Sequence, residues 1–222
     1  MEKCYLTKEN ISSKANEWLD KLIIPCSRMK QFKFQPKNSA LLIIDMQEFF
    51  INKKSHAYLP AAETIIPNIN SIIDAYRKKG FLIIFTLHAL KSNEKPGIMG
   101  RWWKDVPRLD SPLSRIYSSI YWKKNDITLQ KSRYSAFIGT NLDKILKDMK
   151  IDTLVITGIM THLCCESTAR DAFMKDYEVY FVIDATASYN ETLHVSALIT
   201  LTNGFAMPVI TDNILKEVQC IE

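Results

Sequence analysis

The stretch "SALLIIDMQ", Ser39 to Gln47, decides the fold of this 222-residue chain. A continuous apolar run of this length is typical of a strand that is buried on both faces, as the strands of a parallel sheet are. The run ends abruptly at Asp45. Because ligands of open parallel sheets bind beyond the carboxyl ends of the strands, Asp45 stands where a functional residue is expected.

Strand-like and helix-like segments alternate after this first strand. The strand-like runs are "FLIIFTLH" (81–88), "DITLQK" (126–131), "DTLVITG" (152–158), "EVYFVIDA" (178–185) and "AMPVIT" (206–211). The helix-like segments are "PNINSIIDAYRKKG" (67–80), "TNLDKILKDMK" (140–150), "HLCCESTARDAFMKD" (162–176) and "ETLHVSALITLTNG" (191–204). This alternation predicts an α/β fold of three layers, in which helices cover both faces of a doubly wound sheet of about six parallel strands. Residues 89–125 fit neither pattern, which indicates a functional excursion or short helices.

The length of the chain fits one domain better than two. We expect a single domain over residues 39–222, preceded by an N-terminal arm over residues 1–38. Within the arm, "SSKANEWLDKLI" (12–23) predicts an amphipathic helix with Trp18, Leu19 and Leu22 on one side.

Composition excludes several classes of protein. The N-terminus lacks the apolar core of a signal peptide, and no apolar run approaches the roughly 20 residues of a membrane span, so we expect a soluble, cytoplasmic protein. The net charge of +5 is scattered among 24 acidic residues, which argues against nucleic acid as a partner. The odd number of cysteines and their spacing favour free thiols over disulfides or a metal site. The cysteines are Cys4, Cys26, Cys164, Cys165 and Cys220.

Three kinds of reactive side chain follow three of the predicted strands. They are Asp45, Lys131 and the cysteine pair Cys164 and Cys165. Each is weak evidence alone, because such residues more often serve as turn, surface and core residues respectively. Together, a carboxylate can take the proton of a thiol while an ammonium group stabilises the thiolate.

Helical geometry separates the two cysteines. If Thr161 caps the helix, Cys164 lies in the first turn, where free backbone N–H groups and the helix dipole lower the pKa of a thiol. Cys165 instead shares a face with Ala169 and Ala172, which predicts a packing role. Cys164 is therefore the candidate nucleophile.

The turn "GIMT", which starts at Gly158, and the aromatic residues suggest the surroundings of this nucleophile. The backbone N–H groups of Met160 and Cys164 can face one oxygen and form an oxyanion hole. The candidate substrate-pocket residues are Gln47, Trp102, Trp103, Tyr134, Phe137 and His162.

Four motifs resemble the isochorismatase-like cysteine hydrolase superfamily, which includes nicotinamidases, carbamoyl-amide hydrolases and isochorismatases. They lie within residues 39–211, in the order of the family: "ALLIIDMQEFF", "KSRYSAFIGTNLD", "ITGIMTHLCCESTARDAF" and "VIDATAS". The resemblance implies a Rossmann-like hydrolase fold with Asp45, Lys131 and Cys164 as catalytic residues. It also implies a cis peptide between Ile159 and Met160 and a homo-oligomer, a dimer or a tetramer.

The chain departs from two branches of this family. Nicotinamidases bind a metal through an Asp-x-His pair and a second His, where this sequence has Thr86, Leu87 and His88, so we expect no metal and no other cofactor. The N-terminal arm, "KSRYSAF" and "PGIMGRWWKD" resemble isochorismatases, in which the nucleophile position is commonly not cysteine and the Asp protonates a vinyl ether.

Three hypotheses follow for a protein that acts on a small molecule. The first is a metal-independent hydrolase that cleaves a non-peptide C–N bond, amide or carbamoyl, through a thioester on Cys164. The second is a vinyl ether hydrolase of the isochorismatase type, with Asp45 as general acid. The third is a catalytically silent binding protein on the same fold.

Overall fold

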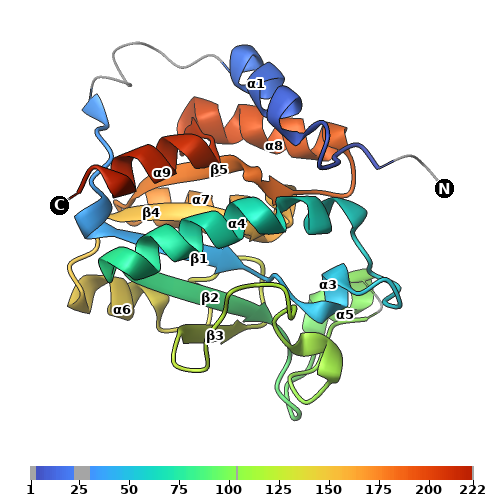
Figure 1. Cartoon of the computed structure of the whole chain (residues 1–222). Helices are drawn as coiled ribbons and strands as arrows, with labels where there is room; N and C mark the ends of the chain where they lie inside the picture. The colour runs from blue at the N-terminus through green and yellow to red at the C-terminus, as the bar shows by residue number, and fades with distance from the viewer. Residues whose placement is uncertain (1–3, 23–30, 104, 222) are drawn as a thin grey trace.

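A parallel sheet forms the centre of the molecule (Figure 1). The structure, a computed structural model, describes residues 4–22, 31–103 and 105–221. The strands pair in the order β3-β2-β1-β4-β5-β6, and every pairing is parallel. Their bounds are β1 (Ser39–Ile44), β2 (Leu82–His88), β3 (Ile127–Lys131), β4 (Thr153–Ile159), β5 (Glu178–Ala187) and β6 (Met207–Val209). The predicted six-stranded α/β fold is confirmed.

Helices cover both faces of this sheet. In Figure 1, α4 (Pro60–Lys79) and α9 (Thr211–Gln219) lie in front of it, while α6 (Leu142–Asp148) and α7 (Glu166–Phe173) lie behind it. Helix α8 (Glu191–Gly204) packs beside α7, and α1 (Ile11–Lys21) of the arm contacts β5. All six residues of β1 are buried, which explains its continuous apolar run.

The two central strands meet closely at the carboxyl edge of the sheet. The strand order reverses between β1 and β4, so this edge is the topological switch point where α/β proteins bind ligands. Ile44 of β1 pairs with Gly158 of β4, whose φ is +108°. A Cβ at Gly158 would lie 2.1 Å from the carbonyl oxygen of Ile44. Glycine therefore permits the close approach of the two strands that lead to Asp45 and to the turn with Cys164.

The structure differs from the sequence-based expectation in several helices. Helix α4 begins at Pro60 and contains Pro67, where we expected the helix to start. Proline suits the first turn of a helix, because the N–H that it lacks has no partner there, and Pro60 occupies that position. Helix α9 and the short α3 (Glu48–Ile51) were not expected. Two further short 3₁₀ turns are η1 (Pro36–Asn38) and η2 (Pro112–Ser114).

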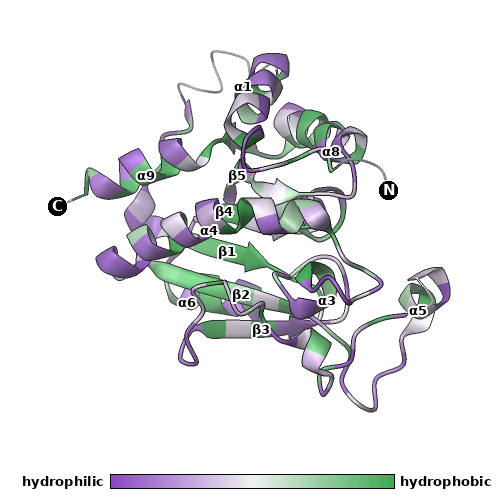
Figure 2. Ribbon diagram, turned by 45° about the vertical axis from the view of Figure 1, so that its right-hand side comes forward, coloured by the Kyte–Doolittle hydropathy of each residue, from purple (hydrophilic) through white to green (hydrophobic). Residues whose placement is uncertain are grey.

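The excursion over residues 89–125 contains the short helix α5 (Gly97–Trp103), which stands away from the sheet in Figure 2. A small apolar cluster of Leu90, Met99 and Val106 holds the excursion together, and Tyr134 packs against it. Isolated bridges also connect Gln47 to Ile116 and Leu90 to Arg108. Because the segment contains α5 and the 3₁₀ turn η2, the expectation of short helices is correct for it.

The described part of the arm packs on the domain through α1. Trp18 and Leu22 are buried and Leu19 is partly buried, as the amphipathic pattern predicts. Across residues 4–22, 31–103 and 105–221, no helix is long and apolar enough to cross a membrane. Cys4, Cys164, Cys165 and Cys220 are free thiols, and Cys26 lies outside the described residues.

Candidate active site

Asp45 directly follows β1, and its side chain is fully buried. Its backbone is left-handed, with φ at +50°, which turns the chain sharply away from the strand. The hydroxyl of Thr86, on β2, donates to Asp45 Oδ1 at 2.6 Å and accepts from the Asp45 N–H at 3.1 Å. Thr86 therefore fixes one carboxylate oxygen and leaves Oδ2 for another partner.

That partner is Lys131, the last residue of β3, which is also buried. Its Nζ donates to Asp45 Oδ2 at 2.7 Å, to the Arg133 carbonyl oxygen at 3.1 Å and to Cys164 Sγ at 3.2 Å. Three acceptors thus match the three N–H groups of an ammonium ion. Burial alone lowers the pKa of Lys131, but the Asp45 carboxylate and Cys164 outweigh burial and raise it. Lys131 is therefore charged at neutral pH.

Cys164 lies in a π-helical turn, η3 (Thr161–Cys165), which leads into α7. Only 6% of the residue is exposed. Burial raises the pKa of its thiol, the negative charge of Asp45 raises it further, and Lys131 opposes the rise. The resting group is a neutral thiol beside a carboxylate that can accept its proton.

This result differs from the expectation that a helix N-terminus lowers the pKa of Cys164. Thr161 is no cap, because its Oγ1 hydrogen-bonds to His194 Nδ1 at 2.8 Å, and the residue before the turn is Met160. The peptide between Ile159 and Met160 is cis, as the resemblance implies. The carbonyl of Met160 accepts hydrogen bonds from the N–H groups of Leu163 and Cys165. Cys165 itself is fully buried.

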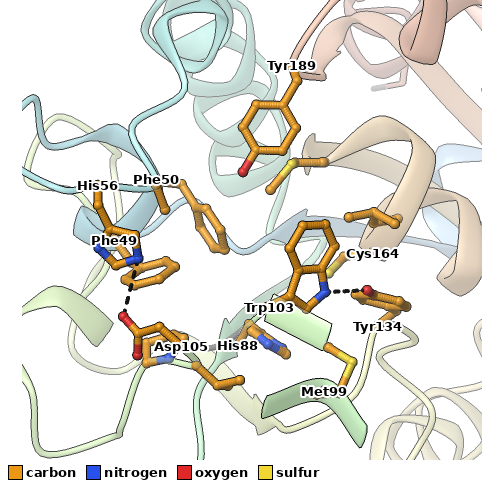
Figure 3. A pocket seen from close by; sticks show the side chains of 15 residues that line it. Phe49, Phe50, His56, His88, Met99, Trp103, Asp105, Tyr134, Cys164 and Tyr189 are labelled. Carbon is orange, nitrogen blue, oxygen red and sulfur yellow. Dashed lines mark hydrogen bonds and ion pairs between the residues drawn. The ribbon is translucent and has the colours of Figure 1, made fainter. Parts of the chain in front are cut away.

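Cys164 lines a cavity of about 140 Å³ (Figure 3). Two of the predicted pocket residues, Trp103 and Tyr134, line it, and Trp103 Nε1 donates to the Tyr134 hydroxyl at 2.7 Å. Met160 also lines it. The walls are mostly apolar and aromatic, and their large side chains include Phe49, Phe50, Met99, Trp103, Tyr134 and Tyr189.

Gln47 does not line this cavity, because its buried amide is used inside the protein. Its Oε1 accepts from the N–H of His88 at 2.7 Å, and its Nε2 donates to the carbonyl oxygens of His88 and of Ser114. Gln47 therefore holds the end of β2 against the excursion.

Three other predicted pocket residues also lie outside the lining. Trp102 is 73% exposed on α5, on the outside of the excursion. Phe137 is buried and stacks on Tyr177, with ring centroids 5.9 Å apart. His162 Nδ1 hydrogen-bonds the Ser188 hydroxyl at 2.6 Å. Phe137 therefore packs in the interior and His162 bonds Ser188, whereas Trp102 is exposed to solvent.

Three polar residues that our pocket prediction missed line the cavity. His88 is buried, its Nδ1 has no hydrogen-bond partner among the described residues, and burial together with the charge of Lys131 lowers its pKa to about 4. The other two contact each other, with His56 Nε2 3.2 Å from Asp105 Oδ2 (Figure 3). No local pattern signals this pair, because the excursion and the segment between α3 and α4 are far apart in sequence.

The site does not match the metal site of nicotinamidases. His88 is present, but Thr86 replaces the expected Asp, and its hydroxyl serves Asp45. Over the three described ranges of the chain, no group of three or more His, Cys, Asp and Glu side chains could hold a metal ion. The donor set that a metal ion of this kind needs is therefore not supplied by these residues.

Comparison with known proteins adds independent findings. The family model described as "Isochorismatase domain" matches residues 39–213. Nicotinamidase 3 of Arabidopsis thaliana is 37% identical over 183 residues, which cover 81% of this chain and 88% of that protein. Isochorismatase of Bacillus subtilis (strain 168) is 32% identical over 83% of this chain, but the match spans only 59% of that protein.

The fold is also found in solved structures. A cysteine hydrolase from Pseudomonas syringae pv. phaseolicola 1448A superimposes with a TM-score of 0.81, covering 85% of this chain and 95% of that chain. Its sequence is 22% identical, so this likeness concerns the fold alone.

Proposed function

Because this chain belongs to the isochorismatase family of hydrolases, we propose that it is a cysteine hydrolase that cleaves a non-peptide C–N bond of a small molecule, amide or carbamoyl, through a thioester on Cys164. The observation that carries the proposal is that one buried ammonium group, that of Lys131, contacts both the Asp45 carboxylate and the Cys164 thiol. Lys131 Nζ lies 2.7 Å from Asp45 Oδ2 and 3.2 Å from Cys164 Sγ.

The proposed reaction begins with transfer of the Cys164 proton to Asp45. Lys131 stabilises the resulting thiolate, which attacks the carbonyl carbon of the substrate. The backbone N–H groups of Met160 and Cys164 receive the oxyanion, and Asp45 then protonates the leaving amine. Water cleaves the thioester, with Asp45 as the base, and the acid product leaves. Burial supports this order, because a thiol with a raised pKa needs a base at the moment of attack.

The cavity supports a small substrate with an apolar or aromatic body. Phe49, Phe50 and Trp103 belong to its walls, and the thiol of Cys164 faces the same space. The name of the Arabidopsis relative, nicotinamidase, indicates an aromatic amide, which makes nicotinamide the first compound to test. No step of the proposed reaction needs a metal ion.

The test is hydrolysis of nicotinamide and a panel of other small amides by the wild type and by Cys164→Ala. We expect loss of activity by roughly 10³-fold or more, since removal of a nucleophile abolishes the covalent route. Cys165→Ala is the matched control, because that buried thiol neighbours Cys164 in the chain and is expected only to pack. Mass spectrometry of the acid-quenched reaction should find the acyl group on Cys164; acylation of Cys4 or Cys220 alone contradicts the proposal.

Vinyl ether hydrolysis is the second candidate, favoured by the isochorismatase relative from Bacillus subtilis. In this reaction Asp45 acts as a general acid and no thiolate is needed. The same Cys164→Ala variant decides between the two. Unchanged turnover of isochorismate by the variant supports the vinyl ether reaction, and complete loss of that turnover excludes it.

A further inference from the structure

A buried tryptophan ties the N-terminal arm to α8. Trp18 is fully buried, and its Nε1 donates to Glu191 Oε1 at 2.9 Å. Lys14 pairs with the same carboxylate at 2.7 Å. Figure 1 shows α1 lying next to α8, and α1 also contacts β5 of the sheet. The arm is therefore fixed to the helix that follows β5.

From Trp18 a line of contacts leads to the turn that carries the candidate nucleophile. The Trp18 ring lies 4.4 Å from the ring of His194, centroid to centroid. His194 is fully buried, and its Nδ1 hydrogen-bonds Thr161 Oγ1 at 2.8 Å. Thr161 is the first residue of the five-residue turn that contains Cys164.

A second line of contacts runs from Tyr5, at the beginning of the described arm. The Tyr5 hydroxyl accepts a hydrogen bond from the N–H of Ser188 at 3.0 Å. The hydroxyl of Ser188 in turn hydrogen-bonds His162 Nδ1 at 2.6 Å. His162 follows Thr161 directly, so the arm reaches two consecutive residues of the same turn through two separate routes.

We propose that the N-terminal arm positions the nucleophile: the contacts Trp18–His194–Thr161 and Tyr5–Ser188–His162 hold the turn at residues 161–165 so that Cys164 Sγ stays beside Lys131 Nζ. The inference rests on the function proposed above for Cys164. Thr161 and His162 are positioning residues, because they act through the turn. Lys131 Nζ cannot follow a displaced thiol, because it also donates to Asp45 and to the Arg133 carbonyl oxygen. A displacement of about 1 Å at such a site can cost about 10²-fold in rate.

Two conservative variants break one route each, and two others serve as controls. Thr161→Val removes the hydroxyl that His194 binds, and Tyr5→Phe removes the hydroxyl that Ser188 binds. Thr157→Val is the control for the first, because the Thr157 hydroxyl is equally buried on β4 and bonds only the Leu42 carbonyl.

Tyr177→Phe is the control for the Tyr5 variant. The Tyr177 hydroxyl donates to Asp143 Oδ1 at 3.0 Å, on α6, and has no contact with the turn. Thermal unfolding of all four variants identifies any that lose stability, so that comparisons are made between variants with similar midpoints.

The first readout is the pH dependence of iodoacetamide alkylation at Cys164, followed by peptide mass spectrometry. Lys131 opposes the rise of the Cys164 pKa, so a displaced thiol should titrate at higher pH and react more slowly at any one pH. The second readout is kcat and KM for an amide that the wild type hydrolyses. For both test variants we expect alkylation to slow at least about 3-fold and kcat to fall about 10-fold, with KM within about 2-fold, as expected for lost positioning.

Alkylation and kcat equal to those of the matched controls in both test variants would overturn the role of the arm. Failure of the proposed function has a different signature, which is full amide turnover by Cys164→Ala. Even then, the alkylation profiles still decide whether the arm positions this turn.

Discussion

Lys131 is a buried cation whose N–H groups all meet acceptors, on Asp45, Arg133 and Cys164. Desolvation of the ammonium is unfavourable, and the adjacent carboxylate offsets it. We therefore expect Lys131→Met, which keeps the volume but removes the charge, to lower the free energy of unfolding by about 3–5 kcal/mol, because it leaves the carboxylate unpaired in the interior. Urea denaturation at neutral pH measures the loss.

Lys147→Met is the matched control for this substitution. Lys147 pairs with Asp143 on the surface of α6 at 2.8 Å, nearly the same distance as in the buried pair. Its side chain is largely exposed, and exposed ion pairs contribute little to stability. Equal losses in the two variants would mean that burial adds nothing to the interaction of Lys131 with Asp45.

The meeting of Asp45, Lys131 and Cys164 was predictable from sequence, while the protonation state of the thiol was not. Each residue lies at the end of a strand of one parallel sheet or just beyond it, and the carboxyl ends of such strands lie at a common edge. The pKa of Cys164 depends instead on burial and on the charge of Asp45, which appear only once the chain is folded. The expected cap was also absent, because His194 engages the hydroxyl of Thr161.

At the scale of the elements, β1 and β4 can carry their end residues into one site because Gly158 has no side chain. Its φ of +108° is unfavourable for other residues, and a Cβ would meet the backbone of Ile44 at 2.1 Å. We expect Gly158→Ala to lower the free energy of unfolding by about 3 kcal/mol or more, since backbone strain and overpacking add together. Chemical denaturation of the purified variant gives the value.

Gly80→Ala separates strain from crowding. Gly80 ends α4 with a left-handed φ of +69°, but open space surrounds the position of its Cβ. We expect a loss of only about 1–2 kcal/mol there, from the left-handed backbone alone. If Gly158→Ala lowers the free energy of unfolding no more than Gly80→Ala does, the strands move to relieve the contact with β1. The close approach of β1 and β4 would then not require glycine at this position.

Elements with a clear hydrophobic period were readable from the sequence, and those governed by tertiary contacts were not. The apolar run of β1 identified a central strand, and α8 has the bounds that its pattern predicted. The apolar period of Ile69, Ile72, Ile73 and Tyr76 predicts a helix over residues 67–80, whereas α4 begins earlier, at Pro60. The π-helical turn that holds Cys164 has no sequence period of its own.

At the scale of the whole molecule, the excursion over residues 89–125 is positioned by contacts between segments that are distant in the sequence. Leu90 bridges to Arg108 within the excursion, and Gln47 bridges from the end of β1 to Ile116. His56 reaches Asp105 from another segment. A single sequence contains no local sign of such pairings, which is why residues 89–125 could be recognised as an excursion but not folded.

Buried titratable groups in three parts of the fold also link stability to pH. Burial lowers the pKa of His194 to about 3, and burial with the charge of Lys131 lowers that of His88 to about 4. The unfolded chain binds these two protons from about pH 6.5 downward, so their contribution is complete above that pH and is lost as the pH falls toward the folded values. Burial raises the pKa of Asp184 to about 6. The folded chain therefore binds this proton more readily than the unfolded chain, and the contribution of Asp184 to stability increases as the pH falls.

We therefore expect the free energy of unfolding to fall by about 3 kcal/mol between pH 6.5 and pH 4.5, because the loss from two histidines exceeds the gain from Asp184 and each pKa unit corresponds to about 1.4 kcal/mol. Urea denaturation at several pH values measures the slope. His194→Gln should make it shallower, since one of the two proton-linked losses disappears. Asp184→Asn should make it steeper, since the opposing carboxyl is removed. Identical slopes in both variants and the wild type would show that neither His194 nor Asp184 takes up protons differently in the folded and unfolded chains, and would contradict their assigned shares of the pH dependence.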